Sequence, residues 1–310
     1  MAGLRPLWEL LAGSGRATVF QDFHWNLLAF TMFAGREEPF VVCARASYGV
    51  AIVPAVARRS DGTLRLLGEE LFDYRGFLHQ GDEEVLSGAL AALARLNRPL
   101  DVVAVRECDR CRAINQLSFV PFSTAPAVHC ADSSPEAFAA RHSRLARNLR
   151  RLQRLGFQLK SYDGKHSALL RSIYQKKALQ DPASLFQDAT RIEFIANAAV
   201  FRPRIFEIFT LEAGSHTAAA LVTLRDGIFR RFYTGWFDPE FEKHSPALTL
   251  IFEVTRQSLA AGLDCDYMTG SQSYKLRVAT NSMPLYRLRA SPQQLAALAG
   301  TVAPEVQSAA

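Results

Sequence analysis

A helix predicted in the middle of the chain places four arginines on one face. They recur at steps of three and four residues, a spacing that brings helical side chains together; they are Arg144, Arg147, Arg151 and Arg154. Three leucines form the adjacent face: Leu145, Leu149 and Leu152. An arginine face without acids indicates an anion site for a phosphate, an RNA backbone or an acidic membrane surface, although a solvated helix face is the alternative.

The residues around these arginines define the helix. Ser133 and Glu136 are expected to form a capping box, with Ser134-Pro135 as an alternative start. Gly156 is a C-terminal stop, so we predict one helix over 135–155. Residues 141–177 hold 11 basic groups and one acid, a net charge of +10, whereas the whole chain carries +6. This segment therefore carries all the excess positive charge.

Length and composition exclude several classes of protein. A chain of 310 residues with 49% apolar and 21% charged residues is typical of a soluble globular protein with one large or two smaller domains. No apolar run approaches the ~18 residues that a membrane-spanning helix needs. No P-loop or Gly-x-Gly-x-x-Gly motif occurs, so nucleotide hydrolysis and Rossmann-type binding have no support.

Cysteine usage argues against a disulfide or metal framework. Five cysteines in 310 residues are too few for a disulfide scaffold, so we expect a reducing, cytoplasmic location. Cys108 and Cys111 form a lone Cys-x-x-Cys pair, whereas a structural zinc ion needs four ligands, usually from two such pairs. We therefore expect no metal site.

The elements that position the arginines belong to an internal repeat. Three dipeptides recur in the same order, at offsets of 165, 165 and 163 residues: Asp61-Gly62 with Asp226-Gly227, Phe72-Asp73 with Phe237-Asp238, and Leu100-Asp101 with Leu263-Asp264. Strand and helix patterns between these marks also match. We interpret the chain as an internal duplication.

Each half is predicted to follow the order β-β-β-α-β. The strands expected in the first half cover 39–46, 50–57, 64–72 and 100–105, with a helix over 83–97 before the last strand. Those expected in the second half cover 205–211, 217–224, 228–237 and 263–268, with a helix over 248–261.

This order and three motifs resemble the FemAB-like branch of the GNAT acyltransferase superfamily, the double-GNAT proteins that include CelD-type proteins. The motifs are the basic helix Arg144 to Gly156, the segment Tyr233 to Ala247 and the segment Gly270 to Ala279. The resemblance covers roughly residues 20–290. It implies an α+β fold with mixed sheets, in which two tandem GNAT-like domains pack around a cleft.

The resemblance also implies acyl-CoA, such as acetyl-CoA, as donor, with its pyrophosphate at the start of the helix in the second half. A helix N-terminus attracts anions, and Ser245 and Pro246 are good N-cap and first-turn residues. The family usually has Gly where this chain has Ala247, whose methyl group hinders the closest approach of a phosphate. The expected donor residues are Ser245, Pro246, Ala247, Leu248, Thr249, Arg147, Arg150 and Arg151.

Only the second half is expected to bind the donor. The corresponding helix start in the first half contains Asp82, Glu83 and Glu84, whose negative charges repel phosphate.

Three catalytic residues follow from the resemblance. Asp73 lies in a segment similar to the family's Asp-Tyr motif and is expected to orient or deprotonate the acceptor. Lys275 lies in the matching Tyr-Lys motif and is expected to bind an anionic substrate group or the oxyanion. Tyr274 is expected to protonate the leaving thiolate.

These observations support an N-acyltransferase that moves an acyl group from acyl-CoA to a small-molecule amine acceptor. One alternative is a Fem-type transferase that uses aminoacyl-tRNA. The other is a catalytically inert double-GNAT module in polysaccharide biosynthesis. The basic helix could contact tRNA or an anionic membrane surface in these cases. Acceptor, acyl length and oligomeric state are left open.

The expected boundaries follow from the repeat. The first domain covers 1–132 and the second 133–290, beginning with the basic helix. Residues 291–310 are expected to form a tail with a short helix near 293–298, followed by disorder, because small residues, Gly and Pro dominate its end.

Overall fold

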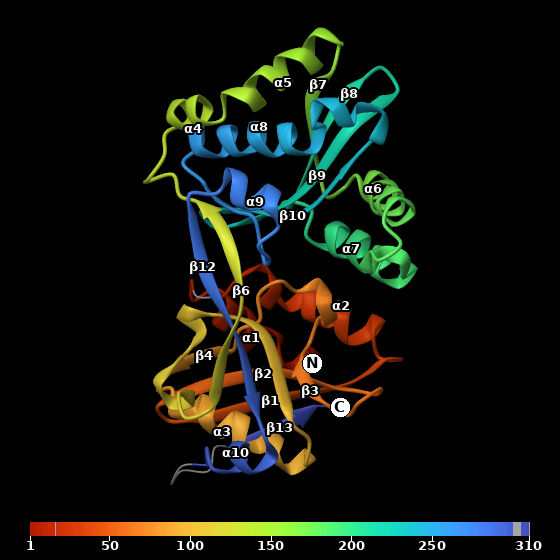
Figure 1. Ribbon diagram of the computed structural model, residues 1–310. Coiled ribbons are helices and arrows are strands. Elements are labelled where there is room, and N and C mark those ends of the chain that lie inside the picture. The colour runs from red at the N-terminus through yellow and green to blue at the C-terminus, as the bar shows by residue number, and fades with distance from the viewer. Residues whose placement is uncertain (16, 300–304, 310) are drawn as a thin grey trace. The chain divides into compact units, whose positions relative to one another are not determined.

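The computed structural model describes residues 1–15, 17–299 and 305–309, and it divides into two compact units (Figure 1). The first unit comprises Met1–Ser123 and Pro284–Ala310, and the second Thr124–Met283. The observed division thus falls after 123 and 283, whereas the sequence suggested 132 and 290. The difference arises because a strand near the C-terminus pairs within the first unit.

The sheet of the second unit has the strand order β6-β11-β10-β9-β8-β7. Neighbouring strands run antiparallel, except the parallel pair β10 and β11. The strands are β6 (Ser118–Val128), β7 (Gln158–Asp163), β8 (Phe206–Ala213), β9 (His216–Asp226), β10 (Phe229–Phe237) and β11 (Asp264–Asp266).

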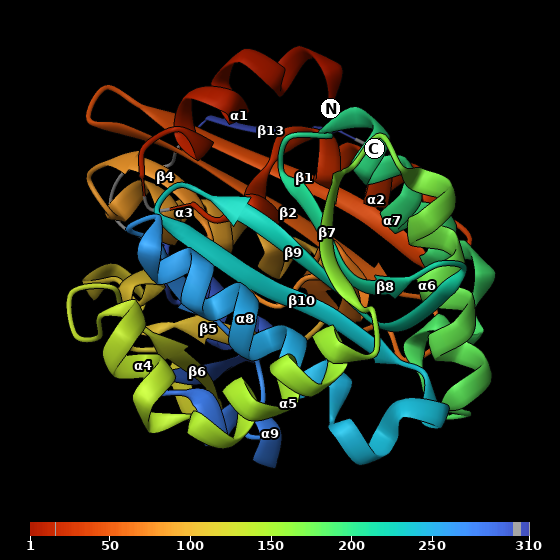
Figure 2. The same cartoon turned by 90° about the horizontal axis from the view of Figure 1, so that it is seen from above.

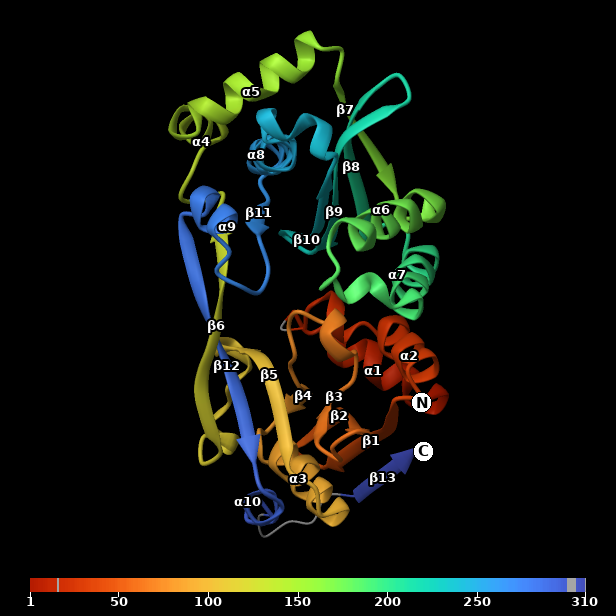
Figure 3. The same ribbon diagram turned by 45° about the vertical axis from the view of Figure 1, so that its right-hand side comes forward.

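Helices cover both faces of this sheet. Helix α8 lies on one face, with α5 on its outer side, and α6 and α7 lie on the other (Figure 3). The helices are α4 (Pro135–Arg141), α5 (Ser143–Arg154), α6 (Ser167–Gln180), α7 (Ala189–Phe201), α8 (Pro246–Ala260) and α9 (Ser273–Val278).

The first unit repeats this plan with the strand order β13-β1-β2-β3-β5-β12. Here β3 and β5 form the parallel pair, and the short strand β4 (Leu78–Gly81) also pairs with β2. The strands of the path are β1 (Glu37–Ala46), β2 (Gly49–Arg58), β3 (Leu64–Leu66), β5 (Leu100–Arg106), β12 (Asn281–Ala290) and β13 (Glu305–Ala309). Its helices are α1 (Arg5–Ala12), α2 (Phe23–Met32), α3 (Glu84–Leu93) and α10 (Pro292–Ala296).

The predicted β-β-β-α-β order is confirmed in both units. The strands β1, β2 and β3, the helix α3 and the strand β5 correspond to β8, β9, β10, α8 and β11. Gly62 and Gly227 both adopt left-handed backbone angles, with φ of 70° and 60°, in the turns that precede β3 and β10. A glycine adopts this conformation without the steric cost that a side chain imposes, which explains why Asp-Gly recurs.

The chain exchanges one strand between the two repeats. Strand β6 follows β5 along the chain, yet Val128 pairs with Cys265 of β11. Strand β12 follows β11, yet Leu285 pairs with Arg106 of β5. The outer strand beside β11 thus follows the first repeat along the chain, and the outer strand beside β5 follows the second.

Two predicted elements are wrong in detail. The single helix over 135–155 is two helices, because the backbone leaves the helical conformation at His142 (φ −107°, ψ 38°), whose ring packs on Phe138 at 4.6 Å. The strand over 64–72 ends at Leu66, and a short 3-10 helix (Glu69–Leu71) follows.

The tail contains the short helix expected near 293–298 and, in addition, a strand. Helix α10 begins with a capping box at Ser291, and β13 pairs antiparallel with β1. The remaining tail positions, 300–304 and 310, lie outside the described residues. Among the helices of the described ranges, none is long and apolar enough to cross a bilayer.

Acid is expected to destabilise the contact between β5 and β12. Arg287 of β12 donates from Nε to Oδ1 of Asp101 at 2.6 Å, and this hydrogen bond lowers the pKa of Asp101. An aspartate whose pKa is lower in the folded protein than its unfolded value of ~3.9 stabilises the fold at pH values above that unfolded value. This stabilisation is lost as the pH falls through the folded pKa. Asp101→Asn should therefore reduce the acid dependence of the free energy of unfolding between pH 7 and 3, measured by urea titration. An unchanged dependence would contradict the assignment.

Candidate functional site

Strands β10 and β11 separate after a short parallel stretch. They pair only from Phe229 with Asp264 to Arg231 with Asp266, and β10 then continues to Phe237 beside β9 alone. The chain beyond β11 follows β6 instead, because the N–H groups of Tyr267 and Gly270 donate to β6 carbonyl groups at 2.9 and 2.8 Å. The second half of β10 therefore has no pairing strand on this side within the described chain.

A β-bulge lies where the two strands separate. The register of β10 against β9 shifts between Phe232 and Thr234. Phe232 and Phe237 consequently both pack in the core that includes α8, although they are five residues apart. Thr234 and Trp236 face α6 instead, because Trp236 lies under the Lys176 ammonium at 4.7 Å. A bulge re-aims side chains in this way and is common beside active sites.

Strand β10 leads directly to the start of α8, which lies along β9 and β10 (Figure 2). Asp238 accepts a hydrogen bond from the Glu240 N–H at 3.0 Å and caps the 3-10 helix Pro239–His244. Helix α8 then begins at Pro246, as predicted.

The expected side-chain cap by Ser245 is wrong. Ser245 has a left-handed backbone (φ 47°, ψ 54°), and its side chain makes no capping hydrogen bond. N-cap residues normally have extended angles, which direct their oxygen at the first-turn N–H groups. These N–H groups of α8 therefore carry no side-chain cap.

The five residues expected at this helix start differ in accessibility. Pro246, Leu248 and Thr249 are buried, and the Thr249 hydroxyl donates to the His244 carbonyl at 3.2 Å. Ser245 and Ala247 are half-buried. Only these two positions could contact a bound phosphate directly.

The Ser245 backbone allows a stability prediction. The left-handed conformation costs a residue with a side chain about 1–2 kcal/mol, whereas glycine avoids this steric cost but loses more backbone entropy on folding. Ser245→Gly should therefore raise the free energy of unfolding by up to about 1 kcal/mol. Ser134 does cap its helix, accepting from the Ala137 N–H at 3.1 Å. Ser134→Ala is the matched control and should lose about 1 kcal/mol. A comparable loss for Ser245→Gly in urea denaturation would contradict the prediction.

The arginine face of α5 lies near this helix start. Arg147, Arg150 and Arg151 are exposed, and within the described residues none of them forms an ion pair. Phe157, just after α5, packs on Phe241, just before α8, with ring centroids 4.9 Å apart. The C-terminal end of α5 therefore adjoins the N-terminal end of α8.

The expected catalytic residues occupy different environments. Lys275 on α9 is 7% exposed, and its ammonium donates to the carbonyls of Thr269 at 2.7 Å and Met268 at 3.4 Å. Its neighbour Tyr274 is 43% exposed. Asp73 is half-buried in the loop before β4 of the first unit, where burial lowers the pKa of the nearby Arg75 guanidinium to about 10 and the Asp73 charge opposes this shift. Their catalytic roles stay predictions.

Sequence reasoning missed two residues of α6 that face β10. The Lys177 ammonium donates to the Gly235 carbonyl at 3.3 Å, and burial lowers its pKa. One turn earlier, the Tyr174 hydroxyl is fully buried near Thr234, and burial raises its pKa. The spacing of three residues between Tyr174 and Lys177 was the available signal, because it places both on one helix face.

The corresponding region of the first unit is filled by aromatic rings. The strand equivalent to β10 is interrupted between β3 and β4, and the inserted loop contributes Phe72 and Tyr74. These rings pack around Phe20, at centroid distances of 5.7 and 6.1 Å, and Trp25 lies 5.8 Å from Phe72. Strand β4, which follows this loop, pairs with β2 alone within the described chain, so the two units differ here in the ring-filled loop and not in the presence of a free strand edge.

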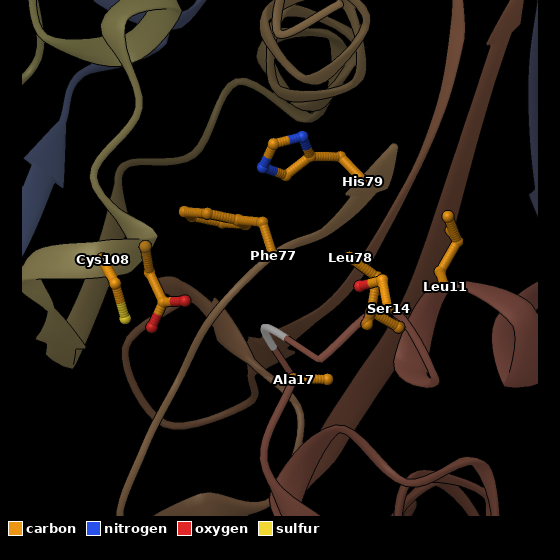
Figure 4. A pocket seen from close by; sticks show the side chains of 8 residues that line it. Leu11, Ser14, Ala17, Phe77, Leu78, His79 and Cys108 are labelled. Atoms are coloured by element: carbon orange, nitrogen blue, oxygen red, sulfur yellow. The ribbon is translucent and has the colours of Figure 1, made fainter. Parts of the chain in front are cut away.

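The Cys-x-x-Cys pair lies in the first unit. Cys111 is buried, and the exposed Cys108 borders a small pocket of the first unit, together with Phe77, His79 and Asp109 (Figure 4). The cavity volume is about 10 Å³, enough for one water molecule. The described residues contain no group of three or more His, Cys, Asp or Glu side chains that could hold a metal ion.

Comparison with known proteins bears on this arrangement. Residues 139–276 match the family model described as "Acetyltransferase (GNAT) domain". The second unit is a GNAT domain. The matched segment contains α5, the bulged strand β10, the start of α8 and most of α9. A search of curated proteins finds no match.

Solved structures extend the similarity over both units. FemX is 10% identical, with 91% of this chain and 95% of that chain covered and a TM-score of 0.59. L-PGS from Bacillus licheniformis is 11% identical, with 94% of each covered and a TM-score of 0.58. A conserved protein of unknown function from Bacteroides thetaiotaomicron VPI-5482 is 8% identical, with 94% and 98% covered and a TM-score of 0.63. The predicted tandem GNAT-like fold is therefore confirmed.

Proposed function

We propose that the chain is an N-acyltransferase that takes an acyl group from acyl-CoA at the second unit. The observation that carries the proposal is the free edge of β10, which leads to the uncapped start of α8 within the segment that matches a GNAT domain. An extended pantetheine arm has amide groups that can pair with such an edge. A pyrophosphate fits the uncapped N–H groups and the helix dipole.

The reaction forms one amide bond and breaks one thioester bond. The acceptor amine, once deprotonated, attacks the thioester carbonyl carbon through its nitrogen lone pair. The tetrahedral intermediate then expels the thiolate, which takes up a proton, so the products are the amide and free coenzyme A. We assign to Asp73 the orientation or deprotonation of the acceptor, and to Lys275 the binding of an anionic substrate group or the oxyanion. Tyr274 is assigned the protonation of the leaving thiolate.

The donor site can be tested by titration calorimetry with acetyl-CoA and longer acyl-CoAs. Ala247→Glu adds a negative charge in the first turn of α8, where it favours the helix but repels phosphate. Ala189→Glu adds the same charge to the first turn of α7 in the same unit and is the matched control. We expect binding at least about tenfold weaker for Ala247→Glu alone. Equal weakening in both variants, or none, would place the donor elsewhere.

A second candidate function rests on the arginine face of α5. Fem-type transfer from aminoacyl-tRNA would use these unpaired arginines on the RNA backbone, and an anionic membrane surface is another possible partner. Binding to RNA should weaken steeply with salt, by about 0.7–0.9 in log K per log unit of salt for each phosphate contacted. Titration with tRNA at several salt concentrations, repeated on Arg147→Ala/Arg151→Ala, distinguishes this donor from acyl-CoA. A chain that binds neither donor would be an inert binding module.

A further inference from the structure

Helix α6 brings two polar groups to the part of β10 that has left β11. The Lys177 ammonium reaches the carbonyl of Gly235, and the Tyr174 hydroxyl lies near Thr234. Both contacts follow the bulge, on the sheet face opposite α8. These residues therefore lie beside the strand segment to which we assign the acyl group.

Neither group is fully satisfied by the protein. An ammonium carries three donors, yet within the described residues only the Gly235 carbonyl, at 3.3 Å, lies within hydrogen-bonding distance of Lys177. The carboxylate that acts on its charge is Asp181, at the end of the same helix, and it makes no ion pair with Lys177. The buried Tyr174 hydroxyl makes no well-formed hydrogen bond in the described part of the chain.

The surroundings make this arrangement costly without a ligand. Lys177 is half-buried, and burial disfavours its charged form. Lys176, the next residue, is exposed and stacks its ammonium over the Trp236 ring. A cation held partly out of water with one carbonyl partner can be stabilised by an anion that completes its donors.

We propose that Lys177 is a positioning residue that binds a carboxylate or phosphate of the acceptor beside β10. The inference rests on the proposed acyl transfer and narrows its acceptor to an amine that carries an anionic group. Lys177 holds that group, while the amine faces the thioester carbonyl along β10.

The kinetic test compares acceptors that differ only in the anionic group. Glycine is paired with glycinamide for a carboxylate, and phosphoethanolamine with ethanolamine for a phosphate. Lys177→Met should lower kcat/KM about 10- to 100-fold for the anionic member of the preferred pair, through KM, because a charged hydrogen bond is lost. The neutral member should be unaffected, and Lys177→Arg should restore part of the loss.

A binding readout keeps the test independent of turnover. In protein labelled with ¹³C-lysine, the ε-carbon signal of Lys177, assigned with Lys177→Met, should shift saturably with acetate or inorganic phosphate. Lys176→Met is the matched control and should leave this response intact. No response to either anion, or an equal loss for both acceptors of a pair, overturns the proposal. Acetyl-CoA binding measured on the same variants should be unchanged, so failure of the donor site is recognised separately.

Discussion

Replacing Arg231 with methionine is expected to lower the free energy of unfolding by about 3–5 kcal/mol. Its guanidinium donates to Asp226 at 2.6 Å and also pairs with Asp266. The Arg231 and Asp266 side chains are each 5% exposed. The substitution removes the cation that pairs with a buried carboxylate, and removing one partner is the costly way to break such a pair. Urea denaturation measures the loss.

A second substitution separates the lost pair from lost packing. Asp266→Asn removes the buried negative charge, while its Oδ1 position can still accept the Met268 N–H, which it does at 2.8 Å. The double variant should therefore recover part of the stability lost in Arg231→Met, a coupling that a double-mutant cycle quantifies. A loss below about 1 kcal/mol in Arg231→Met would mean that the pair is solvated.

Replacing Phe72 with alanine is expected to cost about 3–5 kcal/mol, because the cavity opens within a cluster of aromatic rings. Phe72 is 4% exposed, and a Cβ at Gly68 would lie 2.2 Å from its ring, so the backbone also packs closely there. Phe72→Leu keeps most of the volume and should cost less than about 1.5 kcal/mol. Thermal and urea denaturation provide the measurement.

The same region of the first unit leads to a prediction about how many acyl-CoA molecules the chain binds. The rings of Phe20, Trp25, Phe72 and Tyr74 pack around the loop that interrupts the first unit's counterpart of β10. Calorimetry should therefore give one acyl-CoA per chain for the wild type. Two equivalent sites would show that the first unit also binds the donor and would contradict the role given to these rings.

Local patterns predicted most of the repeated core. The Asp-Gly turns, the alternating strands and the apolar face of α8 depend on neighbouring residues, so they could be identified from the sequence. The match of Phe72-Asp73 with Phe237-Asp238 does not join equivalent positions of the two repeats, because Phe72 precedes β4 whereas Phe237 ends β10. The structural counterpart of Asp238 is Asp82, since each accepts from an N–H two residues later at 3.0 Å. The loop inserted between β3 and β4 shifts the offset.

Long-range contacts could not be predicted. The cap assigned to Ser245 failed because the left-handed backbone is fixed by the connection from β10, not by the residue type. The contact of Lys177 could not be predicted from its neighbours, since its carbonyl partner lies 58 residues away. The pairing partners of β6 and β12 could not be predicted either, because the residues of a strand do not indicate which distant strand pairs with it.

The exchanged strands also affect the order in which the protein can fold during synthesis. The ribosome releases β1 to β5 early, but β12 and β13, which pair with β5 and β1, emerge only after the strands of the second unit. The nascent first unit thus exposes two unpaired strand edges until β12 and β13 emerge, and such edges favour aggregation. All strands of the second unit have emerged by Asp266. We therefore expect the unit encoded later to finish folding first.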